Sequence, residues 1–153
     1  MFDGIRHRVA SLWFPRLASD RVLRLRPIEG PFVQTLKQQN ANRIYCLNVA
    51  ARQQGLHAGM PYADARACCP NLQSQAAQPE QDQRFLHTLR RWATRYCPWV
   101  GLEGKDGLVM DVSGATHLFG GEAAMLADMR LRLMRAGLSV QIGLADTRGA
   151  AWA

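Results

Sequence analysis

The chain has 153 residues, of which 48% are hydrophobic and 20% charged, and its formal net charge is +7. This composition indicates a globular domain with enough apolar side chains for a core, and it excludes a disordered segment. The sequence has no apolar run of the roughly 18 residues that a membrane-spanning helix requires. Its first residues lack the apolar core and cleavage site of a signal peptide, so we expect a cytoplasmic protein without membrane contact.

Arginine supplies 17 of the 19 basic residues. Because a guanidinium group binds phosphate in bidentate fashion, this bias favours a polyanionic partner such as DNA, although a solvated basic surface explains it equally well. The densest basic cluster lies near the N-terminus, and we take its members as candidate contacts with DNA or another polyanion. They are Arg6, Arg8, Arg16, Arg21, Arg24 and Arg26.

The cysteines and histidines predict neither a disulfide framework nor a metal site. Cys68 and Cys69 are adjacent in the sequence and cannot easily pair with each other. The sequence has no CxxC motif, and its four histidines lack the spacing of metal ligands. We therefore expect reduced thiols and no zinc.

The first half of the chain predicts short elements separated by turn residues. Apolar runs, helix caps and the positions of proline and glycine set their limits. The predicted elements are a strand at 9–14, a helix at 19–25, a connection at 27–40, a brief strand at 43–47, and short helices at 48–55 and 61–69.

The second half predicts longer elements, which follow a polar, glutamine-rich segment at 71–83 that we take as a subdomain boundary. Apolar residues at helical spacing and a glycine-flanked turn define them. They are a helix at 80–96, strands at 99–103 and 108–112, a helix at 121–136 and a strand at 138–144. This order predicts an α+β fold of the split βαβ type, with helices on one side of an antiparallel sheet.

Three segments resemble the Y-family of translesion DNA polymerases. Residues 96–120, YCPWVGLEGKDGLVMDVSGATHLFG, are similar to the family's palm hairpin, YSPxVExxSIDEAYLDVTGxxxLFG. Residues 48–61, NVAARQQGLHAGMP, are similar to its fingers sequence NYEARKxGVxxGMP, and residues 12–20, LWFPRLASD, lie where the family has DxDxFFAxVE. The resemblance implies a palm with a ferredoxin-like antiparallel sheet and a small, mostly helical fingers insert.

The resemblance also implies a domain plan. Residues 1–17 and 76–153 would form a discontinuous palm, and residues 18–75 the fingers insert. The thumb and little-finger domains that follow in the family are absent from this sequence, so we expect the chain to bind DNA weakly.

The sequence departs from the family at the metal-binding carboxylates. Matching Trp13 and Phe14 to the aromatic pair of the first motif, we place its two aspartates at Ala10 and Leu12. In the second motif the aspartate is retained as Asp106, and the glutamate is replaced by Gly107. One carboxylate of four cannot hold the two Mg²⁺ ions of nucleotidyl transfer. We therefore expect no catalytic residue, no metal and no other cofactor, and we interpret Asp106 as a turn residue.

Two arginines match phosphate-binding positions of the family. Arg52 matches the arginine that meets the incoming triphosphate, and Arg148 retains the charge of a phosphate-facing lysine. A solvent-facing helix position explains Arg52 equally well.

The pattern resembles the inactive, DNA-damage-induced members of the family that belong to bacterial mutagenesis complexes. It implies a noncatalytic scaffold of the SOS response. Its expected partners are DNA, the sliding clamp, an error-prone C-family polymerase and other mutagenesis proteins, and its expected location is the bacterial cytoplasm, in association with the nucleoid. Two alternatives stay open. One is an active polymerase with a displaced carboxylate set from Asp3, Asp106 and Asp111, and the other is a basic protein-interaction domain without DNA contact.

Overall fold

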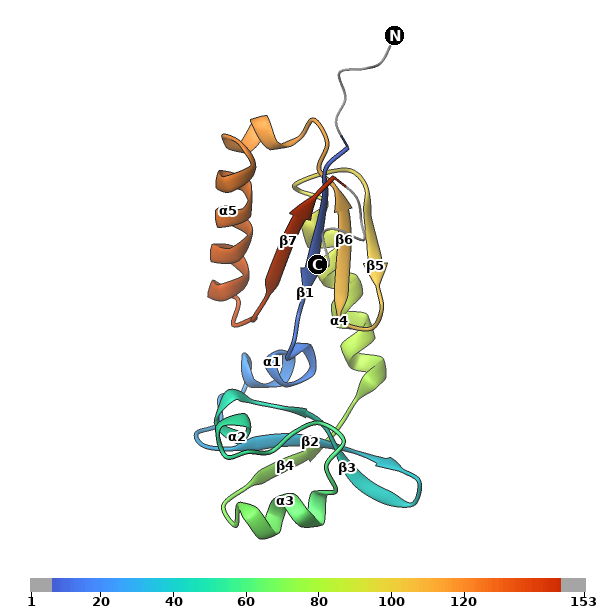
Figure 1. The fold of residues 1–153 in the computed structure, drawn as a ribbon, viewed down its shortest axis with the longest axis vertical. Helices are drawn as coiled ribbons and strands as arrows, with labels where there is room; N and C mark the ends of the chain where they lie inside the picture. The colour runs from blue at the N-terminus through green and yellow to red at the C-terminus, as the bar shows by residue number, and fades with distance from the viewer. Residues whose placement is uncertain (1–6, 147–153) are drawn as a thin grey trace. The chain divides into compact units, whose positions relative to one another are not determined.

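The computed structural model describes residues 7–146, which form two compact units (Figure 1). The discontinuous unit comprises residues 7–15 and 83–146, and the inserted unit comprises residues 16–82. The resemblance implies an insert of residues 18–75, close to these borders. The names palm and fingers for these ranges stay a prediction.

The discontinuous unit is built on a four-stranded sheet. Its strands have the order β5-β6-β1-β7, and every neighbouring pair is antiparallel. The helices α4, most of which belongs to this unit, and α5 connect the strands into the predicted βαββαβ order, which confirms the split βαβ fold (Figure 1). The elements are β1 (Val9–Trp13), α4 (Pro79–Ala93), β5 (Val100–Glu103), β6 (Gly107–Asp111), the 3₁₀ helix η1 (Thr116–Phe119), α5 (Glu122–Arg135) and β7 (Gln141–Ala145).

One face of this sheet belongs to the core. Ala10 and Leu12 of β1 pair with Met110 and Leu108 of β6, and all four side chains are fully buried. Alternate residues of a strand point to opposite faces, so these four residues share one face. The helices contribute buried stripes at helical spacing. These stripes are Leu86, Leu89 and Ala93 in α4, and Met125, Met129 and Leu133 in α5.

The inserted unit contains a three-stranded sheet and short helices. Its strands have the order β3-β2-β4, with β2 and β3 antiparallel and β2 and β4 parallel. The elements are α1 (Leu17–Leu23), β2 (Phe32–Gln38), β3 (Ala41–Leu47), α2 (Val49–Gln53), α3 (Tyr62–Cys68) and β4 (Gln73–Ala76). One core cluster joins sheet and helices, and it includes Val33, Ile44, Ala51, Leu56, Ala65, Cys69 and Leu72.

This sheet corrects the prediction of a mostly helical insert. Residues 27–40, expected as a connection, contain β2, and Gln39 and Asn40 turn into β3 with φ angles of 51° and 63°. The segment 71–83, which we expected to be a subdomain boundary without regular structure of its own, contains β4. Neither strand has the alternating apolar pattern by which a strand is predicted from sequence. The polar residue Gln34 is buried on β2, and β4 depends on backbone pairing with β2 rather than on apolar side chains.

The start of α2 follows the prediction closely. The side chain of Asn48 caps the helix by accepting the backbone N–H of Ala51, and it also accepts the N–H of Phe32. Gly55 adopts the left-handed conformation expected after the helix, with a φ of 86°. Within the part of the chain that the structure describes, no helix is long and apolar enough to cross a bilayer.

Candidate functional site

The end of β1 brings the first polymerase-like motif next to the second. Trp13 pairs with Gly107, and the backbone N–H of Phe14 donates to the carbonyl oxygen of Asp106 at 2.9 Å. The indole Nε1–H of Trp13 donates to Oδ2 of Asp106 at 3.2 Å. The retained carboxylate of the second motif is therefore held by the side chain at the end of the first.

Our placement of the first-motif aspartates at Ala10 and Leu12 stays a prediction, and the structure shows which face of the sheet these two residues take. Both side chains are fully buried on the core face of the sheet and cannot face a metal site. A shift of one residue along a strand moves a side chain to the other face. The opposite face carries Val9, Ser11 and Trp13. When Trp13 is taken as the first aromatic residue of the DxDxFF motif, the two aspartates of the motif fall at Val9 and Ser11.

Gly107 has no space for a larger side chain. A Cβ atom added to it would lie 2.8 Å from the carbonyl oxygen of Glu103 and 3.2 Å from that of Leu12. Both neighbours are backbone atoms of paired strands, so they cannot move aside without disturbing the sheet. The glutamate that the family has at this position is incompatible with the observed conformation of the hairpin.

The displaced carboxylate set considered above does not assemble around one ion. Asp106 precedes β6 and Asp111 ends it, which separates them by about 16 Å at roughly 3.3 Å per residue. Asp3 lies outside the described residues. Within residues 7–146, no group of three or more histidine, cysteine, aspartate or glutamate side chains could hold a metal ion.

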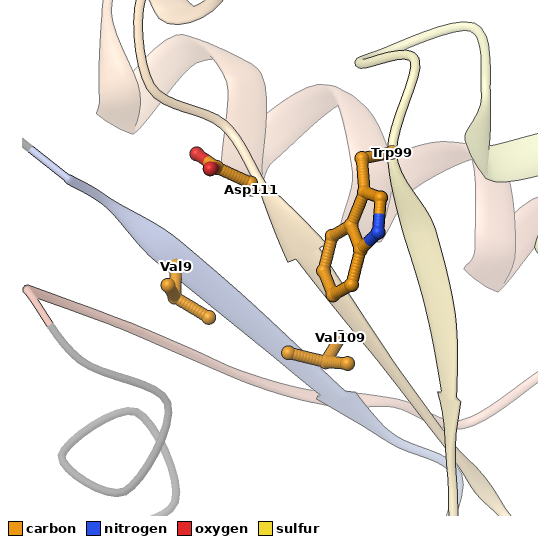
Figure 2. A pocket seen from close by; sticks show the side chains of 4 residues that line it. All are labelled: Val9, Trp99, Val109 and Asp111. Atoms are coloured by element: carbon orange, nitrogen blue, oxygen red, sulfur yellow. The ribbon is translucent and has the colours of Figure 1, made fainter.

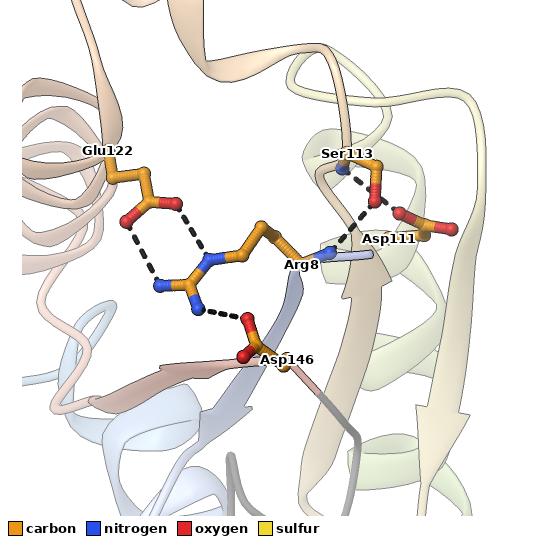
Figure 3. Close-up of polar contacts among 5 residues, drawn as sticks. All are labelled: Arg8, Asp111, Ser113, Glu122 and Asp146. Carbon is orange, nitrogen blue, oxygen red and sulfur yellow. Dashed lines mark hydrogen bonds and ion pairs between the residues drawn. The ribbon is translucent and has the colours of Figure 1, made fainter. Parts of the chain in front are cut away.

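Arg8, predicted as a polyanion contact, is used inside the protein (Figure 3). Its Nε and Nη2 atoms donate to the carboxylate of Glu122 at 2.7 and 3.0 Å, and Nη1 donates to Oδ1 of Asp146 at 2.7 Å. These hydrogen bonds raise the pKa of the guanidinium above its usual value. Two carboxylates occupy the guanidinium, so Arg8 links β1 to α5 and to the end of β7, and its contact with a polyanion stays a prediction.

Arg21, a second member of the same cluster, is also paired inside the protein, and its contact with a polyanion stays a prediction. Its Nε donates to Oδ1 of Asp82 at 2.7 Å, and its Nη2 donates to the side chain of Gln78 at 3.1 Å. Asp82 is buried, so removing its arginine would leave a carboxylate away from water. This ion pair is therefore a structural element of the inserted unit.

The remaining predicted arginines differ in their exposure. Arg24, Arg26 and Arg52 are exposed, and Arg16 is half-buried. Arg6 and Arg148 lie outside the described residues. Their roles in binding DNA or nucleotide phosphates stay predictions.

A shallow cavity of about 310 Å³ lies on the face of the sheet opposite the core (Figure 2). Its lining includes Val9, Trp99, Val109 and Asp111. Sequence reasoning missed it, although the alternation of β6 places Val109 and Asp111 on one face. The signal that could have found it is a tryptophan next to a strand whose outward face carries valine and aspartate.

Comparisons with known sequences agree on one family. The model of the impB/mucB/samB family matches residues 19–153. Protein ImuB of Caulobacter vibrioides (strain NA1000 / CB15N) is 46% identical over 99 residues, which are 65% of this chain and 22% of that protein. DNA polymerase IV of Dehalococcoides mccartyi (strain CBDB1) is 25% identical over 128 residues, which are 80% of this chain and 32% of the polymerase. The chain thus spans between a fifth and a third of these relatives.

Solved structures show the same fold. The post-insertion binary complex of Dbh DNA polymerase superimposes with a TM-score of 0.79 at 18% identity, over 95% of this chain and 44% of the polymerase. DinB from Sulfolobus solfataricus gives a TM-score of 0.76 at 18% identity, with 95% and 44% coverage. These matches confirm a fold of the Y-family polymerase type. With the family match over most of its length, the chain belongs to the impB/mucB/samB family.

Proposed function

We propose that this chain is the polymerase-like part of a noncatalytic subunit that acts as a scaffold in DNA-damage-induced translesion synthesis. The observation that carries the proposal is the arrangement at the end of β1. The indole of Trp13 holds Asp106, and the backbone closes the space beside Gly107.

The chemistry of nucleotidyl transfer explains why this arrangement matters. Two divalent ions activate the attacking oxygen and stabilise the leaving pyrophosphate, and Mg²⁺ requires oxygen ligands in near-octahedral geometry. Here the strand pairing places two acidic residues at this point, Asp106 and Glu103, which pairs with Gly107, and an indole N–H engages one oxygen of Asp106. Within residues 7–146, no three acidic, histidine or cysteine side chains gather where they could hold a metal ion. A polymerase fold without these ligands supports a role in holding partners rather than in catalysis.

The relatives suggest which complex this scaffold serves. One is named Protein ImuB and another DNA polymerase IV, which supports a place in a bacterial mutagenesis complex. We infer that the partners are an error-prone C-family polymerase, the sliding clamp and other mutagenesis proteins, and that the complex works in the cytoplasm at the nucleoid. DNA contact by this chain is weak, because Arg8 and Arg21 are engaged internally.

Primer extension by the full-length protein that contains this chain tests the proposal. We expect no nucleotide incorporation with Mg²⁺ or Mn²⁺, under conditions in which a DNA polymerase IV extends the same primer. Metal-dependent incorporation that disappears in Asp106→Asn would establish an active polymerase and overturn the proposal. Binding to the purified C-family polymerase and to the clamp tests the scaffold role, and failure to bind either protein would contradict it.

A further inference from the structure

We propose that the cavity beside Trp99 is a docking site for a segment of a partner protein that presents an arginine or lysine side chain. This inference goes beyond the proposed function and does not depend on the absence of catalysis. It rests on the shape of the cavity, on the sign of its charge and on the exposure of its aromatic wall (Figure 2).

The cavity has an apolar floor and an aromatic wall. Val9 of β1 and Val109 of β6 lie on neighbouring strands and form the floor. Trp99 precedes β5, and a Cβ atom added at Gly101 would lie 3.6 Å from its ring, so the ring extends over this glycine. A cavity of about 310 Å³ has room for one long side chain of a partner protein.

Trp99 is 56% exposed, although its side chain is large and apolar. A half-exposed tryptophan beside a hollow is typical of protein–protein interfaces, where such residues contribute much of the binding energy. The ring also provides a π face on which a cation can rest.

The charge of the cavity is opposite to that of the chain. Asp111 is the charged residue among the described residues that line it. Its Oδ1 accepts the backbone N–H of Ser113, and its Oδ2 lies 3.9 Å from Nδ1 of His7. Hydrogen bonds from Ser113 lower the pKa of this carboxyl group, so it is ionised at neutral pH.

Arg8, the residue directly before Val9, does not direct its guanidinium to Asp111. The guanidinium of Arg8 is turned to Glu122 and Asp146 instead (Figure 3). An apolar floor with one carboxylate therefore repels the phosphates of DNA and nucleotides. It suits a side chain with an aliphatic stem and a cationic head, which packs the stem on the valines and pairs the head with Asp111.

Nuclear magnetic resonance with two matched peptides tests the proposal. The probes are acetylated, amidated Gly-Ser-Leu-Arg-Leu-Ser-Gly and the same peptide with citrulline, which retains the stem but lacks the charge. We expect saturable shifts of the Trp99 indole N–H and the Val109 methyl groups with the arginine peptide, and clearly weaker ones with citrulline.

Variants of the chain separate the site from general electrostatics. Trp99→Ala should weaken the binding at least about tenfold, as truncation of an interface hot spot does. Asp111→Asn should weaken it about threefold to fivefold, as expected for a partly exposed ion pair. Asp64→Asn removes the same charge from an exposed position in the inserted unit and should change nothing.

Three results would overturn the proposal. Equal binding of both peptides would show that the cationic head is not recognised. Shifts of Trp99 that depend on protein concentration without peptide would show that a second copy of the chain covers this face. Shifts at the cavity caused by a DNA oligonucleotide, and not by the peptide, would show a nucleic-acid site.

Discussion

Asp106 shows how one side chain can remain while its surroundings change. A carboxylate in a metal site shares its charge with ions, whereas here the indole N–H of Trp13 donates to Oδ2 and the carbonyl oxygen of Asp106 accepts from Phe14. The sequence indicated correctly that Asp106 belongs to the hairpin turn. It could not indicate the contact with Trp13, because that contact depends on the register of two strands far apart in the chain.

Gly107 gives the first prediction at the scale of the residue. Gly107→Ala should lower the free energy of unfolding by about 1–3 kcal/mol, because the new methyl group meets backbone oxygens at 2.8 and 3.2 Å. Gly101→Ala is the matched control on the neighbouring strand, where the closest atom lies at 3.5 Å, an ordinary contact. Urea denaturation measures both variants. Equal stabilities would contradict the view that the backbone closes this position.

The placement of Ala10 and Leu12 illustrates a limit of motif matching. The residue types in β1 predict a strand, and the strand is present. Which face each residue takes depends on a single register step, and both faces of β1 contain buried residues, since Ser11 is buried as well. Without a clear alternation of polar and apolar residues, the sequence does not distinguish the two faces.

At the scale of the element, one hydrogen bond links the segment after α4 to α5. The hydroxyl group of Tyr96 donates to Oδ2 of Asp128 at 2.6 Å, and the Tyr96 ring lies 5.1 Å from that of Phe119. Burial, followed by this hydrogen bond, raises the pKa of Tyr96. The same hydrogen bond is the main cause that lowers the pKa of Asp128.

Tyr96→Phe should therefore lower the free energy of unfolding near neutral pH by about 1 kcal/mol, since it removes the hydroxyl group and keeps the buried ring. A carboxyl group with a lowered pKa stabilises the fold above its unfolded pKa of about 3.9, and this contribution is lost as the pH falls through the folded pKa. The stability difference between the two proteins should shrink between neutral and strongly acidic pH. A difference independent of pH would assign the effect to packing alone.

The elements differ in how far the sequence predicts them. The amphipathic stripe of α4 and the hairpin of β5 and β6 follow from local patterns, and both are present. The strand β4 was missed because it is polar and pairs with β2, which is distant in the sequence. The strand β2 forms a local hairpin with β3, but it was missed because polar residues interrupt its apolar pattern. Gln34 is fully buried at the centre of this sheet, which no pattern of hydrophobic residues would indicate.

At the scale of the whole molecule, a net charge of +7 does not translate into a DNA site by itself. Fluorescence anisotropy with primer–template DNA at several salt concentrations should give weak binding with a shallow salt dependence. Exposed Arg26→Gln should reduce the salt slope by about 1 if this residue contacts phosphate. Arg132→Gln, a control at an exposed arginine whose Nε pairs with Asp128, should leave it unchanged. Nanomolar affinity at physiological salt would contradict this account.

The whole fold was more predictable than the site. The motif at 48–61 lies in the inserted unit and the motif at 96–120 lies in the discontinuous unit, so the two motifs together predict the fold class. The site depends on how side chains are oriented, on the indole of Trp13 and on the space beside Gly107, and such features emerge only in three dimensions. The cavity at Trp99 also emerges only in three dimensions, because its lining comes from β1, from β6 and from the segment before β5.

Metal titration tests the central claim most directly. Mg²⁺ and Mn²⁺ would be titrated by calorimetry into this chain and into Asp106→Asn, with and without a deoxynucleoside triphosphate, and a DNA polymerase IV would serve as the positive control. We predict no saturable metal binding by either form of the chain at millimolar concentrations. Saturable binding by the chain that disappears in Asp106→Asn would show a working metal site and contradict the account.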